Sequence, residues 1–298
     1  MDGPLPSPWH DGERALQRTV GLEQRMDEVG RKVVRPYMPD QHRAFFAQLP
    51  FVVLGSVDAS GDAWATLRAG PPGFLASPDP RTLRIDLRPE PADPAQAGMA
   101  DGAAVGLLGI ELHTRRRNRV NGTLRATDGG YVLDVQESFG NCPQYIQVRH
   151  WSPAPAHPVP AQELSALGPE ERAWIGTAAT LFVATYADIA SDTAAGRRVD
   201  VSHRGGAAGF VQVAPDGILT VPDYPGNRFF NTLGNLLLNG RAGLVFVDFA
   251  SGDLLQLSGD AAVVLADGGL PGAERLWRFT PRRIVRRAGA LPLRWQDR

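Results

Sequence analysis

The sequence predicts a mainly β protein built from two similar β-barrel-like units, and three observations lead to this prediction. Its apolar runs are short, strand-sized and separated by turn residues, as at Phe51–Val57. A proline-rich stretch at 152–160 divides the chain near its middle. The same order of predicted elements follows the first helices and then returns after that stretch, which indicates a duplicated unit.

Residues 1–50 are predicted to form an N-terminal helical segment. Apolar residues recur at helical spacing over 22–33, and two prolines follow directly. Asp40 is then positioned to cap a short second helix over 41–48, which Pro50 closes.

Strands dominate residues 51–151, which we assign to the first barrel unit. The runs Phe51–Val57 and Ala63–Ala69 flank a turn rich in Asp, Ser and Gly, so they form a predicted hairpin. Further strands are expected at 83–87, 104–110, 119–126 and 131–136.

Residues 152–163 are the predicted linker, because a proline-rich segment is extended and suits neither a helix nor a central strand. We assign residues 164–298 to a second barrel unit that ends in a strand and a basic tail. Its helices are expected at 164–174 and 229–238, its strands at 181–187, 198–203, 209–213, 218–221, 243–249 and 254–264, and a turn at 188–196.

Two pairs of segments support the internal repeat. The run A-V-G-L-L-G-I-E-L from Ala104 aligns with A-G-L-V-F-V-D-F from Ala242. The run R-V-N-G-T-L from Arg119 aligns with Q-L-S-G-D-A from Gln256. Both matches are short, and they predict the duplication of one small β unit rather than a solenoid.

Composition excludes several classes of function. The 31 basic and 32 acidic residues give a net charge of -1, which offers no bulk attraction for nucleic acid. The single cysteine, Cys142, excludes an internal disulfide and a site made of several cysteines. The six histidines show no zinc-binding spacing, so we expect no metal site. No phosphate-binding Walker loop or hydrolase nucleophile elbow is present.

The expected location is the cytoplasm, without membrane association. The longest apolar runs are strand-sized and too short for a spanning helix. The first ten residues hold three prolines and lack the apolar core of a secretory signal.

The run D-V-S-H-R-G-G-A-A-G-F from Asp200 is the first candidate site. It places a hydroxyl, an imidazole and a guanidinium on Ser202, His203 and Arg204, directly before two glycines. A guanidinium beside glycine backbone amides can bind a phosphate group. A hairpin loop with exposed polar residues explains the run equally well.

The run V-P-D-Y-P-G-N-R-F-F-N-T-L-G-N from Val221 is the second candidate. Asn227, Arg228 and Asn231 crowd the start of the predicted helix. A helix N-terminus beside an arginine attracts anions. Ordinary capping by Asn227 is the alternative, and it leaves Arg228 and Asn231 unexplained.

The first unit contributes a third candidate. A basic run begins at His113, and a solvated turn explains most of it better than nucleic-acid binding does. Arg119 and Asn121 alternate along the following strand, so they share one face. Asn141 and Cys142 then lie at a turn in S-F-G-N-C-P-Q. No histidine partner for the thiol is evident, so we expect it to pack or to touch a cofactor rather than act as a nucleophile.

Four of these motifs together resemble the flavin-nucleotide-binding proteins related to pyridoxamine 5′-phosphate oxidase. They are D-V-S-H-R-G-G, P-D-Y-P-G-N-R-F-F-N, R-V-N-G and F-G-N-C-P-Q, and the resemblance covers most of 51–264. It implies tandem FMN-binding split β-barrels and FMN as the cofactor. By position it implies cofactor contacts from Asp200, Val201, Ser202, His203, Arg204, Asp223, Asn227, Arg228 and Asn231, with Ser202, Arg204, Asn227 and Arg228 at the phosphate.

The two units are incomplete in complementary ways. The second unit has the phosphate-binding motifs, but Leu257-Ser258-Gly259 stands where R-V-N-G is expected. The first unit has R-V-N-G, but its phosphate loop reads D-L-R-P-E-P-A-D-P from Asp86, and these acids repel a phosphate. Members of the family usually dimerise with flavin between subunits. We therefore infer an intramolecular pseudo-dimer with one composite FMN site, to which the first unit supplies Arg119, Asn121, Asn141, Cys142 and Gln144.

The resemblance implies an FMN-dependent oxidoreductase whose substrate the sequence does not specify. Its partners would be a small-molecule substrate and NAD(P)H or a reductase, and a homodimer stays open. The alternative is a non-catalytic module that binds flavin or haem and transfers electrons or docks against a partner. The arginines at 282–287 are available for such docking, although a solvated strand face explains them more simply.

Overall fold

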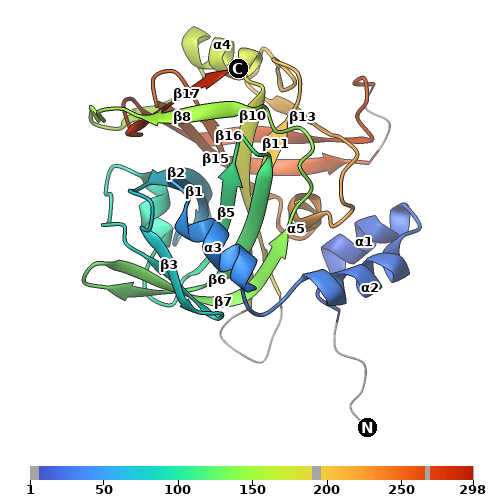
Figure 1. Ribbon diagram of the computed structural model, residues 1–298. Coiled ribbons are helices and arrows are strands. Elements are labelled where there is room, and N and C mark those ends of the chain that lie inside the picture. Colours follow the sequence, from blue (N-terminus) through green and yellow to red (C-terminus); the bar gives the residue numbers. More distant parts are fainter. Residues whose placement is uncertain (1–6, 190–195, 266–268, 298) are drawn as a thin grey trace.

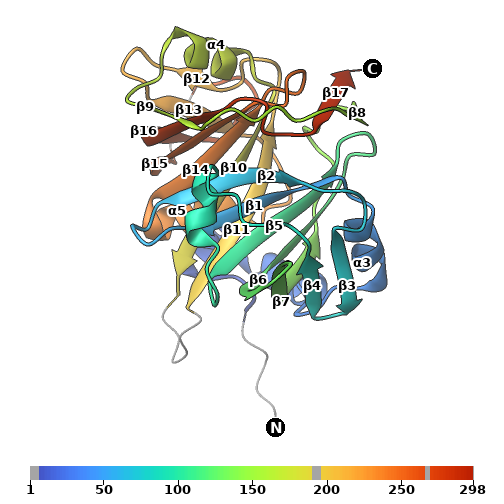
Figure 2. The same ribbon diagram turned by 90° about the vertical axis from the view of Figure 1, so that its left-hand side faces the viewer.

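Two large antiparallel sheets make up most of the protein and pack against each other (Figures 1 and 2). The computed structural model describes residues 7–189, 196–265 and 269–297. The predicted turn at 188–196 falls mostly outside the described residues, as do the first six residues of the N-terminal segment. The predicted mainly β fold is confirmed, and the arrangement is consistent with split barrels.

The first sheet has seven strands in the order β2-β1-β5-β6-β7-β4-β3. Strand β1 is buried along its whole length, because both of its faces are covered. A short 3-10 helix, η1 (Pro94–Gly98), connects β4 to β5. The strands are β1 (Phe51–Val57), β2 (Ala63–Ala69), β3 (Leu75–Asp79), β4 (Thr82–Ile85), β5 (Ala104–Glu111), β6 (Arg116–Thr127) and β7 (Gly130–Gly140).

The second sheet has the order β11-β10-β14-β15-β16-β13-β12, and helix α5 (Asn231–Asn239) connects β13 to β14. The short strand β9 (Gln162–Leu164) adds to the side of β16. The strands are β10 (Thr180–Asp188), β11 (Arg197–Gly205), β12 (Gln212–Val213), β13 (Leu219–Asp223), β14 (Arg241–Val247), β15 (Leu254–Val264) and β16 (Arg275–Arg287).

The two sheets have the same strand order once each strand is matched to its counterpart, β1 to β10 and so on to β7 and β16. The segments aligned in the sequence fall on counterpart strands, β5 with β14 and β6 with β15. The contact between the sheets is reciprocal as well. A Cβ atom at Gly106 would lie 2.7 Å from the Val199 carbonyl oxygen, and one at Gly243 would lie 2.3 Å from that of Ala63. Each sheet therefore presents the same surface to the other, as in a two-fold dimer.

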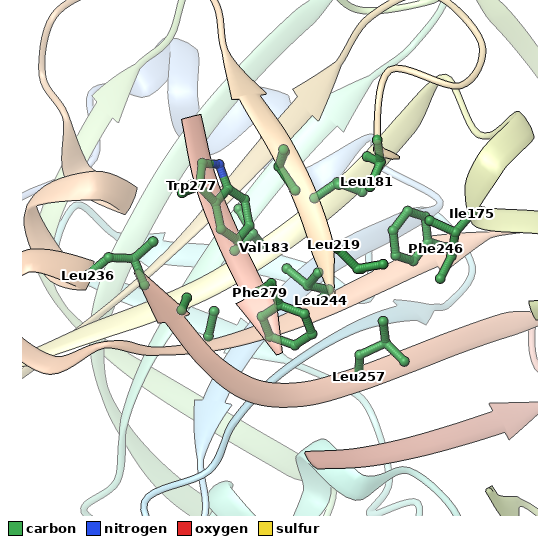
Figure 3. Packing of buried hydrophobic residues seen from close by; sticks show 14 of the residues in the cluster. Ile175, Leu181, Val183, Leu219, Leu236, Leu244, Phe246, Leu257, Trp277 and Phe279 are labelled. Carbon is green, nitrogen blue, oxygen red and sulfur yellow. The ribbon is translucent and has the colours of Figure 1, made fainter. Parts of the chain in front are cut away.

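Three apolar clusters hold this arrangement together. We call each sheet with its connecting segments one half of the molecule, and one cluster lies within each half. Figure 3 shows the cluster of the second half, where Trp277, Phe279 and Phe246 are fully buried. The third joins the halves and includes Val53 from β1 and Phe182 from β10. The contact between the halves is thus an apolar core with the character of a permanent interface.

The helices correct the sequence prediction in part. Helix α2 (Glu23–Val33) and helix α3 (Asp40–Ala47) match it, but α3 has Pro39 as its N-cap rather than Asp40. Helix α1 (Asp11–Thr19), which lies beside α5, was not predicted because Leu16 is its single buried aliphatic side chain. Helix α4 (Pro169–Thr177) starts five residues later than predicted, because the helix begins at Pro169, which suits a first turn, and Leu164 belongs to β9.

The proline-rich stretch at 152–163 is tied to the C-terminal strands at both ends. Strand β8 (Arg149–Pro153) pairs with β17 (Leu293–Asp297), and β9 pairs with β16. The sequence assigned this C-terminal region only as a strand and a tail. Among the described residues, no helix has both the length and the apolar character needed to cross a bilayer.

Candidate functional site

A polar cavity of about 90 Å³ lies where the two halves meet. Strand β6 and the loop after β7 line it from the first half. Strand β11, the loop after β13, the first turn of α5 and the start of β16 line it from the second half. The site is therefore composite, because neither half alone encloses it.

Most of the residues predicted from the sequence meet in this cavity. They are Arg119, Asn141, Cys142, Gln144, Ser202, His203, Arg204, Asp223, Asn227, Arg228 and Asn231.

Three predicted residues do not line the cavity. Asp200 and Asn121 border a smaller neighbouring cavity, which they share with Asn231. Val201 is fully buried in the core between the halves, where its side chain packs over Gly55. Side chains alternate along a strand, so Val201 points away from the face that carries Ser202. The structure therefore does not bring the side chain of Val201 to the cavity.

Arg119 joins the two halves at the floor of the cavity. Its guanidinium donates to Asn231 Oδ1 at 2.6 Å and to Ser202 Oγ at 2.5 Å. It also lies 3.2 Å from Asp200 Oδ1. Burial lowers the pKa of Arg119, and Asp200 opposes that effect. The hydroxyl of Thr232 completes the network with a 2.8 Å bond to Ser202 Oγ.

Three further arginines are paired with two carboxylates at one side of the cavity. Arg204 and Arg275 each lie 3.0 Å from an oxygen of Asp223. Arg228 Nη2 donates to Glu274 Oε1 at 2.6 Å, and Arg275 Nη2 donates to Glu274 Oε2 at 2.8 Å. The hydrogen bond from Arg228 lowers the pKa of Glu274 and raises that of Arg228. Arg275 therefore holds both acids in place.

His203, which borders the cavity, is neutral. Burial lowers its pKa well below 6.5, and the charges of Arg117 and Arg204 add to the effect. Arg117 Nη1 lies 3.1 Å from His203 Nδ1 and can only donate, so Nδ1 accepts and Nε2 carries the proton. His203 Nε2 has no hydrogen-bond partner although it is buried.

Three other buried donors on residues that line the cavity also lack partners, Arg119 Nε, Arg204 Nε and Asn141 Nδ2. An unpaired buried donor costs roughly 1–3 kcal/mol. Four such donors around one cavity indicate a ligand rich in acceptor oxygens.

Helix α5 begins at the cavity with an uncapped N-terminus. Its N-cap, Phe230, has a left-handed backbone and no capping side chain, so the first backbone N–H groups remain available to an anion. Asn227, the predicted N-cap, instead accepts from the N–H of Phe229 at 3.2 Å. Among the described residues, four non-glycine residues have positive φ, and Tyr145, Arg228 and Phe230 of these border the cavity. Backbone strain of this kind clusters at functional sites.

The two glycines after Arg204, Gly205 and Gly206, do not form the predicted phosphate-binding loop. The N–H of Gly206 donates to the carbonyl of Ala179, so it is already used within the fold. Gly205 instead lets another chain segment approach, because a Cβ there would lie 2.2 Å from the Tyr145 carbonyl oxygen. The loop after β7 thus packs directly on the end of β11.

The lining residues that the predicted set did not include are Arg117, Tyr145, Gly205, Pro222, Tyr224, Gly226, Phe230, Thr232 and Arg275. Arg117 lies two residues before Arg119 on the same strand, so strand alternation was a usable signal. Arg275 is brought to Asp223 by the pairing of β13 with β16, which requires the fold. Tyr145 and Tyr224 cover the cavity from opposite halves, with ring centroids 5.3 Å apart.

Comparison with known proteins identifies one matching family. Residues 38–150 match the family model of pyridoxamine 5′-phosphate oxidase. HupZ of Group A Streptococcus is 15% identical, with a TM-score of 0.30 over 40% of this chain and 91% of that chain. HutZ, the haem storage protein of Vibrio cholerae, is 16% identical, with a TM-score of 0.27 over 39% and 91%. An FAD-binding protein of Mesorhizobium loti is 15% identical, with a TM-score of 0.26 over 43% and 97%. No curated protein sequence matches the chain.

Proposed function

Because residues 38–150 match the family model of pyridoxamine 5′-phosphate oxidase, we propose that the chain binds one FMN in the composite cavity. One observation carries the proposal. Buried donors from both halves converge on a single cavity, and His203 Nε2, Arg204 Nε and Asn141 Nδ2 among them lack an acceptor. We keep 51–151 and 164–298 as the proposed limits of the two units.

The charge of the cavity supports an anionic ligand. Five guanidinium groups line it and three carboxylates pair with them, which leaves 5 − 3 = +2 while His203 is neutral. That balance suits a phosphate dianion. The arginines are Arg117, Arg119, Arg204, Arg228 and Arg275, and the acids are Asp200, Asp223 and Glu274.

The enclosed volume of about 90 Å³ accommodates a phosphate group but not a whole flavin nucleotide. We place the phosphate near Arg204, Arg228 and the uncapped start of α5. The larger part of FMN then requires the covering rings of Tyr145 and Tyr224 to move. Tyr145 is 39% exposed, and its hydroxyl makes a single hydrogen bond, to the Pro225 carbonyl. We therefore expect the ring of Tyr145 to move at a low cost in free energy.

A bound FMN would supply hydride or electron transfer, and the chain would orient it and exclude water. We propose an FMN-dependent oxidoreductase, with a small-molecule substrate and NAD(P)H or a reductase as the source or acceptor of electrons. Pyridoxamine phosphate would need a second basic phosphate site, but of the nearby arginines Arg197 pairs with Asp188 and Arg198 pairs with Glu137. The substrate class is therefore left open.

The alternative is a binding module for flavin or haem that does not turn over a substrate. One observation favours haem: His203 Nε2 is buried without a partner at the cavity, and imidazole nitrogen is a common axial ligand of haem iron. To bind iron, Nε2 of the neutral imidazole would have to be unprotonated, so the proton would have to sit on Nδ1. The hydrogen bond that Arg117 donates to Nδ1 opposes this tautomer. The geometry therefore supports flavin over haem.

An absorption spectrum of the purified protein, followed by anaerobic reduction, tests the proposal. We expect flavin bands and one FMN per chain after reconstitution. Rapid bleaching by NADH or NADPH alone supports the enzyme, and bleaching only after a reductase is added supports the module. A Soret band without flavin bands, or two FMN per chain, would refute the composite FMN site.

A further inference from the structure

The reciprocal packing of the two halves creates a second position related to the cavity by the pseudo-two-fold axis. The register of the strands identifies its residues. Gly55 pairs with Gly106 and Ala65, just as Ala184 pairs with Gly243 and Val201. Ala65 of β2 is thus the counterpart of Val201 of β11. Counting along the two strands, Thr66 corresponds to Ser202 and Arg68 to Arg204.

The same register extends to the other two strands. Asn121 pairs with Gly106 and Ser258 pairs with Gly243, so Gln256 stands where Arg119 stands in the cavity. Arg119 pairs with Phe139, and Gln256 pairs with Val285. Asn141 lies two residues after Phe139, and Arg287 lies two residues after Val285. Arg287 is therefore the counterpart of Asn141.

At this second position, two carboxylates of the chain itself fill the space between the counterpart residues. Asp93 is fully buried, and it accepts from Thr66 Oγ1 at 2.6 Å and from Gln256 Nε2 at 3.0 Å. It also caps η1 by accepting from the N–H of Ala95 at 3.1 Å. Arg287 Nη1 lies 3.1 Å from Asp93 Oδ2.

Glu90 supplies the second carboxylate. Arg68 Nε lies 3.1 Å from Glu90 Oε2, and Arg287 Nη2 binds Glu90 Oε1. Both arginines are buried, at 5% and 4% exposure, so each needs an anionic partner. Arg68 Nη1 nevertheless has no hydrogen-bond partner. The position thus has two guanidinium groups and two carboxylates, whereas the cavity keeps an excess of two positive charges.

We propose that this position is a latent anion site, which the carboxylates of Asp93 and Glu90 close from within the chain. The latent site consists of Thr66, Arg68, Gln256 and Arg287 around these two acids. Asp93 caps η1, and we compare its carboxylate with the phosphate that we propose at the start of α5. The acids of the loop after β4 therefore do more than repel a ligand: they stand in for its anionic group. The identity of that ligand rests on the proposed function, but the anion chemistry of the latent site does not.

The test removes the two internal carboxylates and supplies small anions instead. The variant Glu90→Ala/Asp93→Ala leaves Arg68 and Arg287 buried without partners, so we expect Tm to fall by about 5–10 °C in a gluconate buffer. Formate or inorganic phosphate should then restore most of the loss with saturation at millimolar concentration. The wild-type chain without FMN gives the baseline, because its composite cavity also attracts anions, and the double variant should gain clearly more in Tm from formate than the wild type does. The variant Asp11→Ala/Asp40→Ala is the matched control, because it removes two exposed acids with the same change in net charge.

Three further outcomes decide the proposal. Adding Arg287→Met to the double variant should abolish the rescue by formate. If the double variant does not fold, Glu90→Gln alone, at a partly exposed residue, should show a smaller rescue of the same form. A double variant that formate and phosphate do not rescue, or an equal response in the Asp11/Asp40 control, overturns the latent site. Because Tm is measured without FMN, these results are independent of whether the cavity binds flavin.

Discussion

Charge removal at Arg204 and Arg228 provides the sharpest test of how the cavity binds its ligand. The substitution Arg204→Gln leaves Asp223 paired with Arg275 at 3.0 Å. The substitution Arg228→Gln leaves Glu274 paired with Arg275 at 2.8 Å. Neither change therefore strands a carboxylate. Because both arginines are about a quarter exposed, we expect a loss of stability of at most about 1 kcal/mol each.

The effect on FMN binding should be much larger. A hydrogen bond to a charged group contributes about 1.5–3 kcal/mol, and 1.36 kcal/mol is a factor of ten. We expect each single variant to weaken FMN binding roughly ten- to hundredfold, and the double variant by about 10²- to 10⁴-fold. Quenching of flavin fluorescence on titration with protein measures these affinities.

Riboflavin, which lacks the phosphate, makes the test specific. Its affinity should be nearly unchanged by Arg204→Gln/Arg228→Gln, because the lost contacts are those of the phosphate. The matched control is Arg241→Gln, which removes an arginine from a carboxylate that keeps a second one, since Asp62 retains Arg282. Equal weakening of FMN and riboflavin, or no weakening of FMN, would refute the assignment of these arginines to the phosphate.

Three other expectations follow from the fold and the cover of the cavity. Gly106→Ala should destabilise the chain by about 1–3 kcal/mol in denaturant titrations, because the added Cβ meets the Val199 carbonyl at 2.7 Å, whereas Gly129→Ala meets open space; equal effects would contradict the packing. Burial raises the pKa of Glu13 to about 8, above its unfolded value of 4.5, so the contribution of Glu13 to stability should be largest below pH 4.5 and decline as pH rises to 8. Glu13→Gln should remove that fall in thermal melts, and an unchanged slope would exclude Glu13 as its source. Tyr145→Ala should speed FMN association in stopped-flow traces by uncovering the cavity, and an unchanged rate would show that the ring is not a barrier.

The fold was largely predictable because most strands coincide with apolar runs that lie between turn residues. The strands Phe51–Val57 and Leu254–Val264 agree with their predicted bounds to the residue. Helix α1 escaped prediction because it buries polar Glu13 and Gln17 beside Leu16, so it lacks an apolar stripe. Local sequence cannot indicate that these polar groups find partners in another half of the chain.

The residues of the candidate site that lie within the sequence motifs were predictable. Ser202, Arg204 and Arg119 were assigned from two distant segments, and the structure brings them together. The role of Arg275 was not accessible, because it depends on which strand pairs with β13. The availability of the Gly206 amide was misjudged for the same reason, since its acceptor is the carbonyl of Ala179, the residue directly before β10.

The matching strand order of the two sheets within one chain has a consequence for how the cavity and its symmetry-related position can diverge. In a homodimer, every substitution appears at both symmetric positions, so a change that blocks one blocks the other. Here Arg68 and Arg204 are encoded separately, and each has acquired different partners, Glu90 and Asp223. The tether also makes assembly of the shared cavity independent of protein concentration, so dilution that would separate two subunits leaves this pair of halves joined.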